Sequence, residues 1–326
     1  MEKRKTKRIG MVIGMVTLML VFFSSEAFPW GWAVHAYVDD HLGKKRGLNN
    51  INEIYGGMVP DVFNYMFDNP DYLGYLSYQT HNEFMKVWRE ARCGSEKSLA
   101  YGFVTHNDAW GADSTAHHSG RTIGQEEGYV TAKAELLKLI VLDVLEQLFE
   151  QLPSDPPDPD LLEAIALEVS HELVENGIDI LMKGIDPMIG QKIMFSALLR
   201  SPELPHLLVR TYAADFSDYA DISFHKAAKI IISAEMEFRR SMIFYGQALL
   251  QDDVASIELI SEQTADVARS FLAANGIEIP PELDVTPLIM FLTQEAIAAC
   301  ADDFASEIME TVGFVNDNLV IEGISY

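Results

Sequence analysis

Long stretches of this chain repeat apolar residues at helical spacing, and this pattern limits the possible folds more than any other feature. The repeat is clearest in residues 129–151, where leucine, isoleucine and valine recur every three or four positions. Alternating runs typical of half-buried strands are scarce. We therefore predict an all-α fold, a multi-helix bundle. The same pattern fills residues 161–182, 189–199, 222–250 and 254–274.

Two proline-containing breaks divide this helical pattern. The sequence Pro-Ser-Asp-Pro-Pro-Asp-Pro at residues 153–159 cannot continue a helix, and we interpret it as a loop inside a domain. A weaker break follows residues 202–205. We predict a helical domain over residues 28–205, with residues 206–326 as a helical extension or cap packed on it.

The first 27 residues have the three parts of a secretory signal peptide. Basic residues at positions 3–8 precede an apolar run at residues 9–23 and a small-x-small sequence, Ser25-Glu26-Ala27. The apolar run is shorter than the roughly 20 residues that span a bilayer, which favours a cleaved signal over a membrane anchor. We predict an exported protein, located in the periplasm or the extracellular medium.

The charge balance limits the possible partners. The chain has 49 acidic and 24 basic residues and a net charge of −25. This charge disfavours duplex nucleic acid and allows at most a transient contact with a membrane surface. Cys93 and Cys300 are the two cysteines. They form a single bridge or remain two thiols, and neither lies in a metal-binding cysteine pattern.

Imidazole and carboxylate groups, which are typical zinc ligands, recur along the first 180 residues. His171 and Glu175 are four residues apart in a predicted helix, so their side chains share one face. This spacing is typical of a chelating pair and also of a surface pair. The sequence predicts a metal site if other ligands lie close to them.

A second group lies between residues 106 and 118. His106, Asp113 and His117 are separated by seven and four residues, which places them within about 40° of one another on a continuous helix. Gly111 could interrupt that helix. Asp108 is an alternative to Asp113, and His118 is an alternative to His117.

Three further candidates stand singly. Asp61 follows a Gly-Gly turn and Pro60, so it either ends a tight loop or caps a helix over residues 62–67. His81 opens the segment of residues 82–91. His35 lies in an apolar stretch that follows Trp30. A lone histidine at either place is more often structural than a ligand.

Taken in order, these segments resemble the zinc-dependent phospholipase C and S1/P1 nuclease superfamily over about residues 28–180. The resemblance implies a bundle of the phospholipase C type whose zinc-binding catalytic domain is residues 28–205. It rests on Trp30-Gly31-Trp32-Ala33-Val34-His35, Gly57-Met58-Val59-Pro60-Asp61, His81, the stretches 102–106 and 112–117, and His171 with Glu175.

The resemblance implies two or three zinc ions. A third ion would use His35, a bridging Asp113 and the backbone amine and carbonyl of an N-terminal Trp30. Cleavage after Ala27 would leave two residues ahead of Trp30, so that ion requires further trimming. The central histidine and aspartate are seven residues apart here rather than the family's four. The other two ions would be held by Asp61, His81, His106 and Asp113, and by His117, His171 and Glu175.

The function implied is hydrolysis of a phospholipid or another phosphodiester by a zinc-bound hydroxide, with Asp61 or Glu175 assisting proton transfer. One alternative is a single-strand nuclease or 3′-nucleotidase, which requires an aromatic pocket for a base. Another is an exported protein that binds zinc without catalysis. Candidates for the aromatic pocket are Phe63, Tyr65, Phe67 and Trp110.

Overall fold

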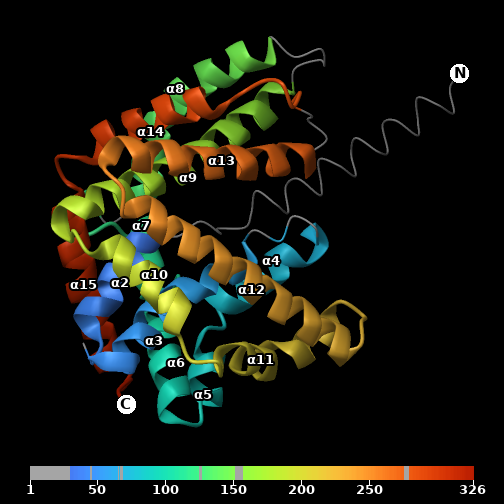
Figure 1. The fold of residues 1–326 in the computed structure, drawn as a ribbon, viewed down its shortest axis with the longest axis vertical. Coiled ribbons are helices and arrows are strands. Elements are labelled where there is room, and N and C mark those ends of the chain that lie inside the picture. The colour runs from blue at the N-terminus through green and yellow to red at the C-terminus, as the bar shows by residue number, and fades with distance from the viewer. Residues whose placement is uncertain are drawn as a thin grey trace, which may run out of the picture.

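All regular structure in the described part of the chain is helical, which confirms the all-α prediction (Figure 1). The computed structural model describes residues 30–44, 46–64, 66, 69–124, 127–150, 157–274 and 279–326. The elements are α2 (Trp32–Leu42), α3 (Gly47–Met58), the 3-10 helix η1 (Val59–Phe63), α4 (Pro70–His81), α5 (Met85–Glu90), α6 (Gly94–His106), α7 (Ala112–His117), α8 (Tyr129–Phe149), α9 (Pro159–Ile185), α10 (Ile189–Leu199), α11 (Leu204–Tyr219), α12 (Phe224–Leu249), α13 (Asp253–Ala274), α14 (Thr286–Cys300) and α15 (Phe304–Ile321).

Each of the five segments with helical periodicity forms one helix, namely α8, α9, α10, α12 and α13. Side-chain caps explain two of the starts. The Asp158 carboxylate accepts a hydrogen bond from the Asp160 backbone N–H before α9, and the Ser223 hydroxyl accepts one from the Lys226 N–H before α12. Pro159 occupies the first turn of α9, where no N–H is needed. Residues 151–156 of the predicted loop lie outside the described residues.

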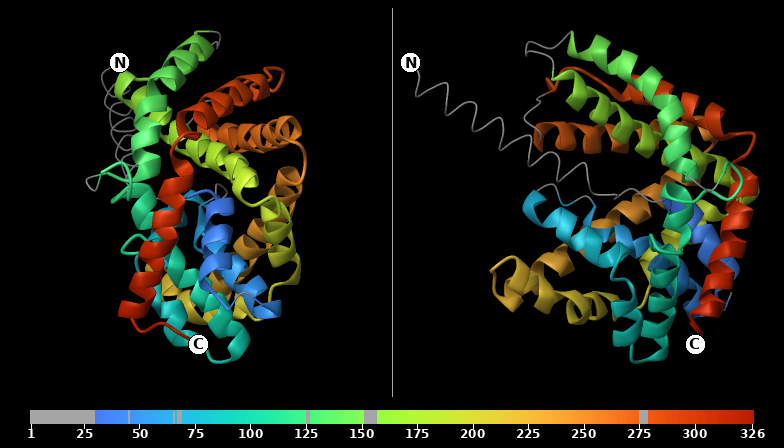
Figure 2. Two further views of the ribbon diagram at one scale, coloured as in Figure 1. Left: turned by 90° about the vertical axis from the view of Figure 1, so that its left-hand side faces the viewer. Right: turned by 180° about the vertical axis from the view of Figure 1, so that it is seen from behind.

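Two groups of helices build the fold (Figures 1 and 2). Helices α8, α9, α13 and α14 lie side by side, and α2, α3, α6, α10 and α12 form the second group. Helix α2 packs against α3, α9 and α10, so it lies where the two groups meet. Helix α15 packs against α2 and α7 at one edge. The candidate ligands come from both groups.

One hydrophobic core contains residues from both sides of the predicted boundary at residue 205. Buried polar contacts cross the boundary as well. The hydroxyls of Thr115 and Thr311 are 2.8 Å apart, and the Tyr245 hydroxyl donates to the Asp179 carboxylate at 2.9 Å. The later helices therefore pack on the earlier ones, while the division into two domains stays a prediction.

Three further predictions concern the ends of the chain and its cysteines. The predicted signal peptide, residues 1–27, lies outside the described residues. Among the described helices, none combines the length and the apolar character needed to cross a membrane. Cys93 is exposed, Cys300 is buried, and both are free thiols, so the unbridged alternative is the one that the structure shows.

Candidate metal centre

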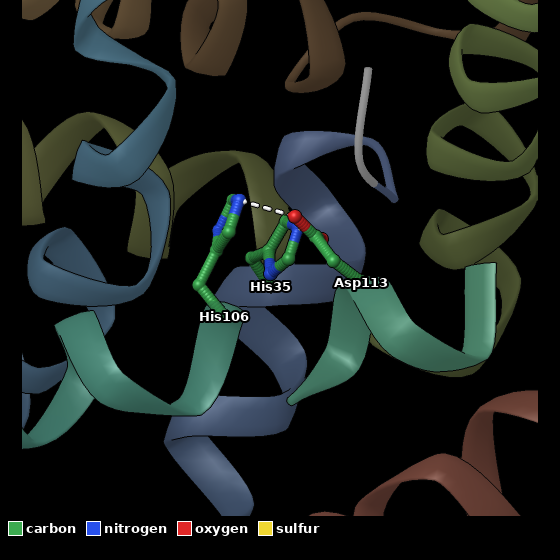
Figure 3. A group of neighbouring side chains, drawn as sticks. All are labelled: His35, His106 and Asp113. Atoms are coloured by element: carbon green, nitrogen blue, oxygen red, sulfur yellow. Dashed lines mark ion pairs between the residues drawn. The ribbon is translucent and has the colours of Figure 1, made fainter. Parts of the chain in front are cut away.

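His35, His106 and Asp113 meet in a buried cluster formed by α2, α6 and α7 (Figure 3). His35 Nε2 lies 3.2 Å from Asp113 Oδ1, and His106 Nε2 lies 2.8 Å from Asp113 Oδ2. The two imidazole rings are stacked, with centroids 3.9 Å apart. The fold thus brings together three of the predicted ligands from distant parts of the sequence.

Asp61 and His81 join the same cluster. Asp61 Oδ1 lies 3.4 Å from both His81 Nε2 and His106 Nε2. His81 Nε2 also lies 3.6 Å from Asp113 Oδ2. Of the four side chains predicted to hold the first ion, His81 and His106 therefore each lie close to both carboxylates, and all four are buried.

One of the two alternatives for Asp61, the helix cap, is wrong, and so is the predicted position of His81. Asp61 lies inside η1 and caps no following helix, because residues 59–63 form a short 3-10 turn directly after α3. Its carboxylate is buried and accepts a hydrogen bond from Asn64 Nδ2 at 3.0 Å. His81 is the last residue of α4 rather than the first of the segment that follows.

Backbone carbonyls orient two of the imidazoles. His106 Nδ1 lies 2.7 Å from the Gly57 carbonyl oxygen, and His81 Nδ1 lies 2.9 Å from that of Ser77. A carbonyl only accepts, so each ring donates from Nδ1 and directs Nε2 toward the cluster. Metal-binding histidines commonly have such a partner on the second nitrogen.

The electrostatics of the cluster fit a cation. Burial opposes the charge on His106, but the carboxylates of Asp113 and Asp61 outweigh it and raise the pKa of the imidazole well above its usual value. His81 Nε2 and His106 Nε2 are nevertheless only 3.2 Å apart. A cation between them would satisfy both nitrogens together with the carboxylates. Buried atoms without a hydrogen bond in the described part of the chain include His35 Nε2, Asp61 Oδ2 and both oxygens of Asp113.

The turn between α6 and α7 places Asp113 opposite His106. A helix continuous through residues 106–117 is contradicted, because α6 ends at His106 and α7 begins at Ala112. The Asn107 side chain accepts the backbone N–H groups of Ala109 and Trp110, both at 2.9 Å. A Cβ atom on Gly111 would lie 2.3 Å from the His106 carbonyl oxygen. The predicted ligands therefore meet across a turn that requires glycine.

Replacing Gly111 with alanine is expected to destabilise the fold by about 1–3 kcal/mol, because the added methyl group overlaps backbone atoms that cannot move independently. Urea unfolding measures this change. Gly184 in α9 provides the matched control, since its Cβ position is open. Gly184→Ala is expected to be neutral or to stabilise the helix by up to about 1 kcal/mol. Equal stability of the two variants would contradict this account of the turn.

His117, His171 and Glu175 form a second cluster, in which α7 meets α9. His171 Nε2 lies 3.5 Å from Glu175 Oε1, and the rings of His117 and His171 have centroids 5.1 Å apart. Both ring nitrogens of His117 are buried without a hydrogen bond to the described residues. Burial, together with the charges of Glu172 and Asp61, raises the pKa of Glu175 well above its usual value.

The structure separates the alternatives that the sequence leaves open. Asp113 contacts His35, His81 and His106. Asp108 instead forms a group with His117 and His118, and its Oδ1 lies 3.8 Å from His117 Nδ1. Of the two histidines, His117 is the one grouped with His171 and Glu175.

Trp30 is fully buried beside these clusters. Its indole Nε1 donates to the Thr115 hydroxyl at 2.9 Å, and its ring stacks on Tyr129. Thr115 belongs to α7, the helix that carries Asp113 and His117. The indole ring thus fixes the start of α2 against the helix that supplies two predicted ligands.

Sequence reasoning missed the other acidic residues of α9. Asp179 lies one turn beyond Glu175, and its carboxylate accepts the backbone N–H groups of Ala33 at 2.9 Å and Val34 at 3.3 Å. It therefore holds the first turn of α2, near His35. The four-residue spacing of positions 171, 175 and 179 is a signal that could have identified Asp179. A cavity of about 280 Å³ is lined by Asp61, Glu172, Glu175 and Asp179 among other residues.

The acidic side chains of α9, namely Glu168, Glu172 and Asp179, are expected to make the stability of the metal-free protein depend on pH. Burial and neighbouring carboxylates raise the pKa of Glu168 to about 8, and those of Glu172 and Asp179 to about 7. The folded state then binds more protons than the unfolded state above the ordinary carboxyl pKa, so stability falls as pH rises from about 4 to 8. At about 1.4 kcal/mol for each proton and pH unit, each of these carboxyl groups is expected to contribute a loss of roughly 2–3 kcal/mol between pH 5 and pH 8. Urea unfolding with a chelator present measures it, and equal or greater stability at pH 8 would exclude this role for the carboxylates.

Comparisons with known proteins leave the family open. Neither a protein-family model, nor a curated protein, nor a solved structure matches this chain. The resemblance to the phospholipase C and S1/P1 nuclease superfamily therefore stays a prediction from the residues quoted above.

Proposed function

We propose that this protein is an exported zinc-dependent phosphodiester hydrolase related to the phospholipase C and S1/P1 nuclease superfamily. One observation carries the proposal. Imidazole nitrogens and carboxylate oxygens from five separate elements converge at 2.8–3.6 Å, and in the described residues several of these buried atoms make no hydrogen bond. Such a cluster is costly without a cation, because buried polar atoms need partners.

The donor set favours zinc. Histidine nitrogens mixed with carboxylate oxygens suit zinc, whereas calcium and magnesium take mainly oxygen ligands. One ion would be held by Asp61, His81, His106 and Asp113. A second would be held by His117, His171 and Glu175. His35 lies beside Asp113 Oδ1, whereas His81 and His106 lie beside Oδ2. His35 would therefore hold a third ion together with the backbone of Trp30.

The cavity beside the clusters favours catalysis over a purely structural site. Asp61 and Glu175 belong to the ligand clusters and also line the cavity, so a substrate can reach them. A structural zinc site is closed by four protein ligands, while a catalytic one leaves a position for water. When bound, zinc lowers the pKa of water and stabilises charge on a phosphoryl oxygen. Asp61 and Glu175 would accept a proton from that water.

Lipid or another small phosphodiester is favoured over a nucleic acid strand. The charged side chains that line the cavity in the described residues are all carboxylates, which would repel a chain of phosphates. Phe63, a candidate for base stacking, is fully buried in the core, and Tyr65 and Phe67 lie outside the described residues. Trp110 packs edge-on against Phe84.

The test compares a phosphatidylcholine analogue, bis(p-nitrophenyl) phosphate and single-stranded RNA as substrates for the purified protein loaded with zinc. We expect chelator-sensitive hydrolysis of the first two and little of the third. Faster hydrolysis of RNA would assign the nuclease function instead. Bound zinc without hydrolysis of any of the three would reject catalysis.

A further inference from the structure

A second cavity extends the candidate site along one face of α12. It has a volume of about 620 Å³ and adjoins the first cavity, because Ser241 and Ser270 line both. Lys226, Ile230, Ala234 and Phe238 also line it, at helical spacing from the N-terminal end of α12. The two cavities together form a groove that leads from Asp61 and Glu175 toward Lys226.

The second cavity suits a hydrocarbon chain. Five of its twelve lining residues are apolar, and the polar ones include the carboxylate of Glu237 besides the two lysines. The apolar residues are Val62, Met66, Ile230, Ala234 and Phe238. At 1.5 Å per residue, the stretch of α12 from Lys226 to Ser241 is about 22 Å long. One leaflet of a bilayer has about 15 Å of hydrocarbon. The groove is therefore long enough for an acyl chain whose phosphate lies at the metal centre.

Lys226 and Lys229 at the far end of the groove are unusual among the described lysines. Each of the others contacts a carboxylate, a backbone carbonyl or an aromatic ring. Lys226 and Lys229 make no such side-chain contact with the described residues, and they are the only basic side chains found to line either cavity there. In so acidic a chain, two unpaired ammonium groups at the mouth of a groove suit an anionic partner such as a lipid phosphate.

The turn between α11 and α12 carries exposed aromatic residues beside these lysines. Tyr219 ends α11 and is 56 % exposed, and Phe224 begins α12 and is 53 % exposed. The turn projects from the edge of the molecule in Figures 1 and 2. Asp218 and Asp221 lie nearby, so with the two lysines the turn is close to neutral. Aromatic and basic side chains together are typical of surfaces that contact a membrane interface.

We propose that the α11–α12 turn docks on a phospholipid bilayer and that the groove along α12 admits one acyl chain to the metal centre. Phe224 enters the interface beside Tyr219, whose ring stacks on Tyr75, while Lys226 and Lys229 contact lipid phosphates. This inference rests on the proposed hydrolase function for the role of the groove. The docking surface itself is testable without hydrolysis.

The experiment measures sedimentation of the full mature protein with vesicles of a phosphonate analogue of phosphatidylcholine, which cannot be hydrolysed at that bond. Phe224→Ala is expected to weaken binding about tenfold, because one phenyl ring no longer leaves water. With an anionic phospholipid added to the vesicles, Lys226→Glu with Lys229→Glu is expected to weaken binding about fivefold or more per lysine. The thermal unfolding temperature of each variant is measured as a control, and a value equal to that of the wild type shows that the variant is folded.

Two variants away from the groove are matched controls. Phe244 on α12 is 41 % exposed, and Arg46, which precedes α3, is also exposed. Neither residue lines either of the two cavities, so Phe244→Ala and Arg46→Glu are expected to bind vesicles like the wild type. Docking at the turn is overturned if the wild type does not bind vesicles, or if all variants bind alike.

A third outcome would also overturn the proposal that the α11–α12 turn docks on a bilayer. If the lysine variant loses binding to a single-stranded oligonucleotide and keeps binding to vesicles, the groove is a nucleic acid site. Failure of the proposed function would be recognised by a different result, namely no zinc-dependent hydrolysis of bis(p-nitrophenyl) phosphate by the wild type. The two hypotheses can therefore fail independently.

Discussion

Replacing His106 with alanine is expected to remove at least one bound zinc ion and to lower phosphodiester hydrolysis by about 10²–10³-fold or more. His106 Nε2 lies within 3.5 Å of Asp61, His81 and Asp113, and its Nδ1 is held by the Gly57 carbonyl. No other described side chain contacts all three. The variant leaves the buried Asp113 carboxylate without its nearest nitrogen and removes one of the two imidazoles beside Asp61, so we also expect a loss of stability of about 3–5 kcal/mol.

Metal content separates a lost ligand from a lost fold. His106→Gln is a second variant that keeps a polar side chain of similar size, and it is also expected to lose zinc. His206→Ala is the control, because His206 is exposed on α11 and belongs to no cluster found in the described residues. A folded His106→Ala protein with wild-type zinc content would contradict the assignment of His106.

Removing the metal from the wild-type protein is expected to lower the thermal unfolding temperature by roughly 10 °C or more. Each ion bound only by the folded state contributes about 4 kcal/mol at a thousandfold excess over its dissociation constant. Without zinc, the carboxylates of Asp61, Asp113 and Glu175 stay buried close to one another and lose their counter-charge. Differential scanning calorimetry with and without a chelator measures the shift.

The pH dependence sharpens this measurement. The chelator effect should be larger at pH 8 than at pH 5, since protons compete with zinc for the imidazole ligands at the lower pH and also neutralise the neighbouring Glu172 and Asp179, whose pKa values are raised to about 7. Zinc added after dialysis should restore the original unfolding temperature. An unfolding temperature that does not respond to the chelator at pH 8 would argue against bound metal.

The sequence predicts the long helices of this fold well, because their cores require apolar residues every three or four positions. Helix α10 begins and ends at the predicted residues, and α13 begins one residue early. The order of His35, Asp61, His81 and His106 along the chain also points to a shared site. Local spacing cannot show whether such residues meet, since that depends on how distant helices pack.

The turn at residues 107–111 shows the limit most clearly. The spacing from His106 to Asp113 fits a continuous helix, but the backbone of Gly111 approaches the His106 carbonyl too closely for any side chain. The contact of Asp179 with Ala33 spans 146 positions and likewise has no local signature. Contacts of this kind decide the geometry of the centre, and the sequence does not contain them in readable form.

The most direct test of the central claim is the metal content of the purified protein, measured by mass spectrometry after dialysis against buffer without chelator. The account predicts two or three zinc ions per chain, and fewer in a folded Asp113→Ala variant. A folded wild-type protein that retains no divalent metal, even after incubation with zinc, would contradict it.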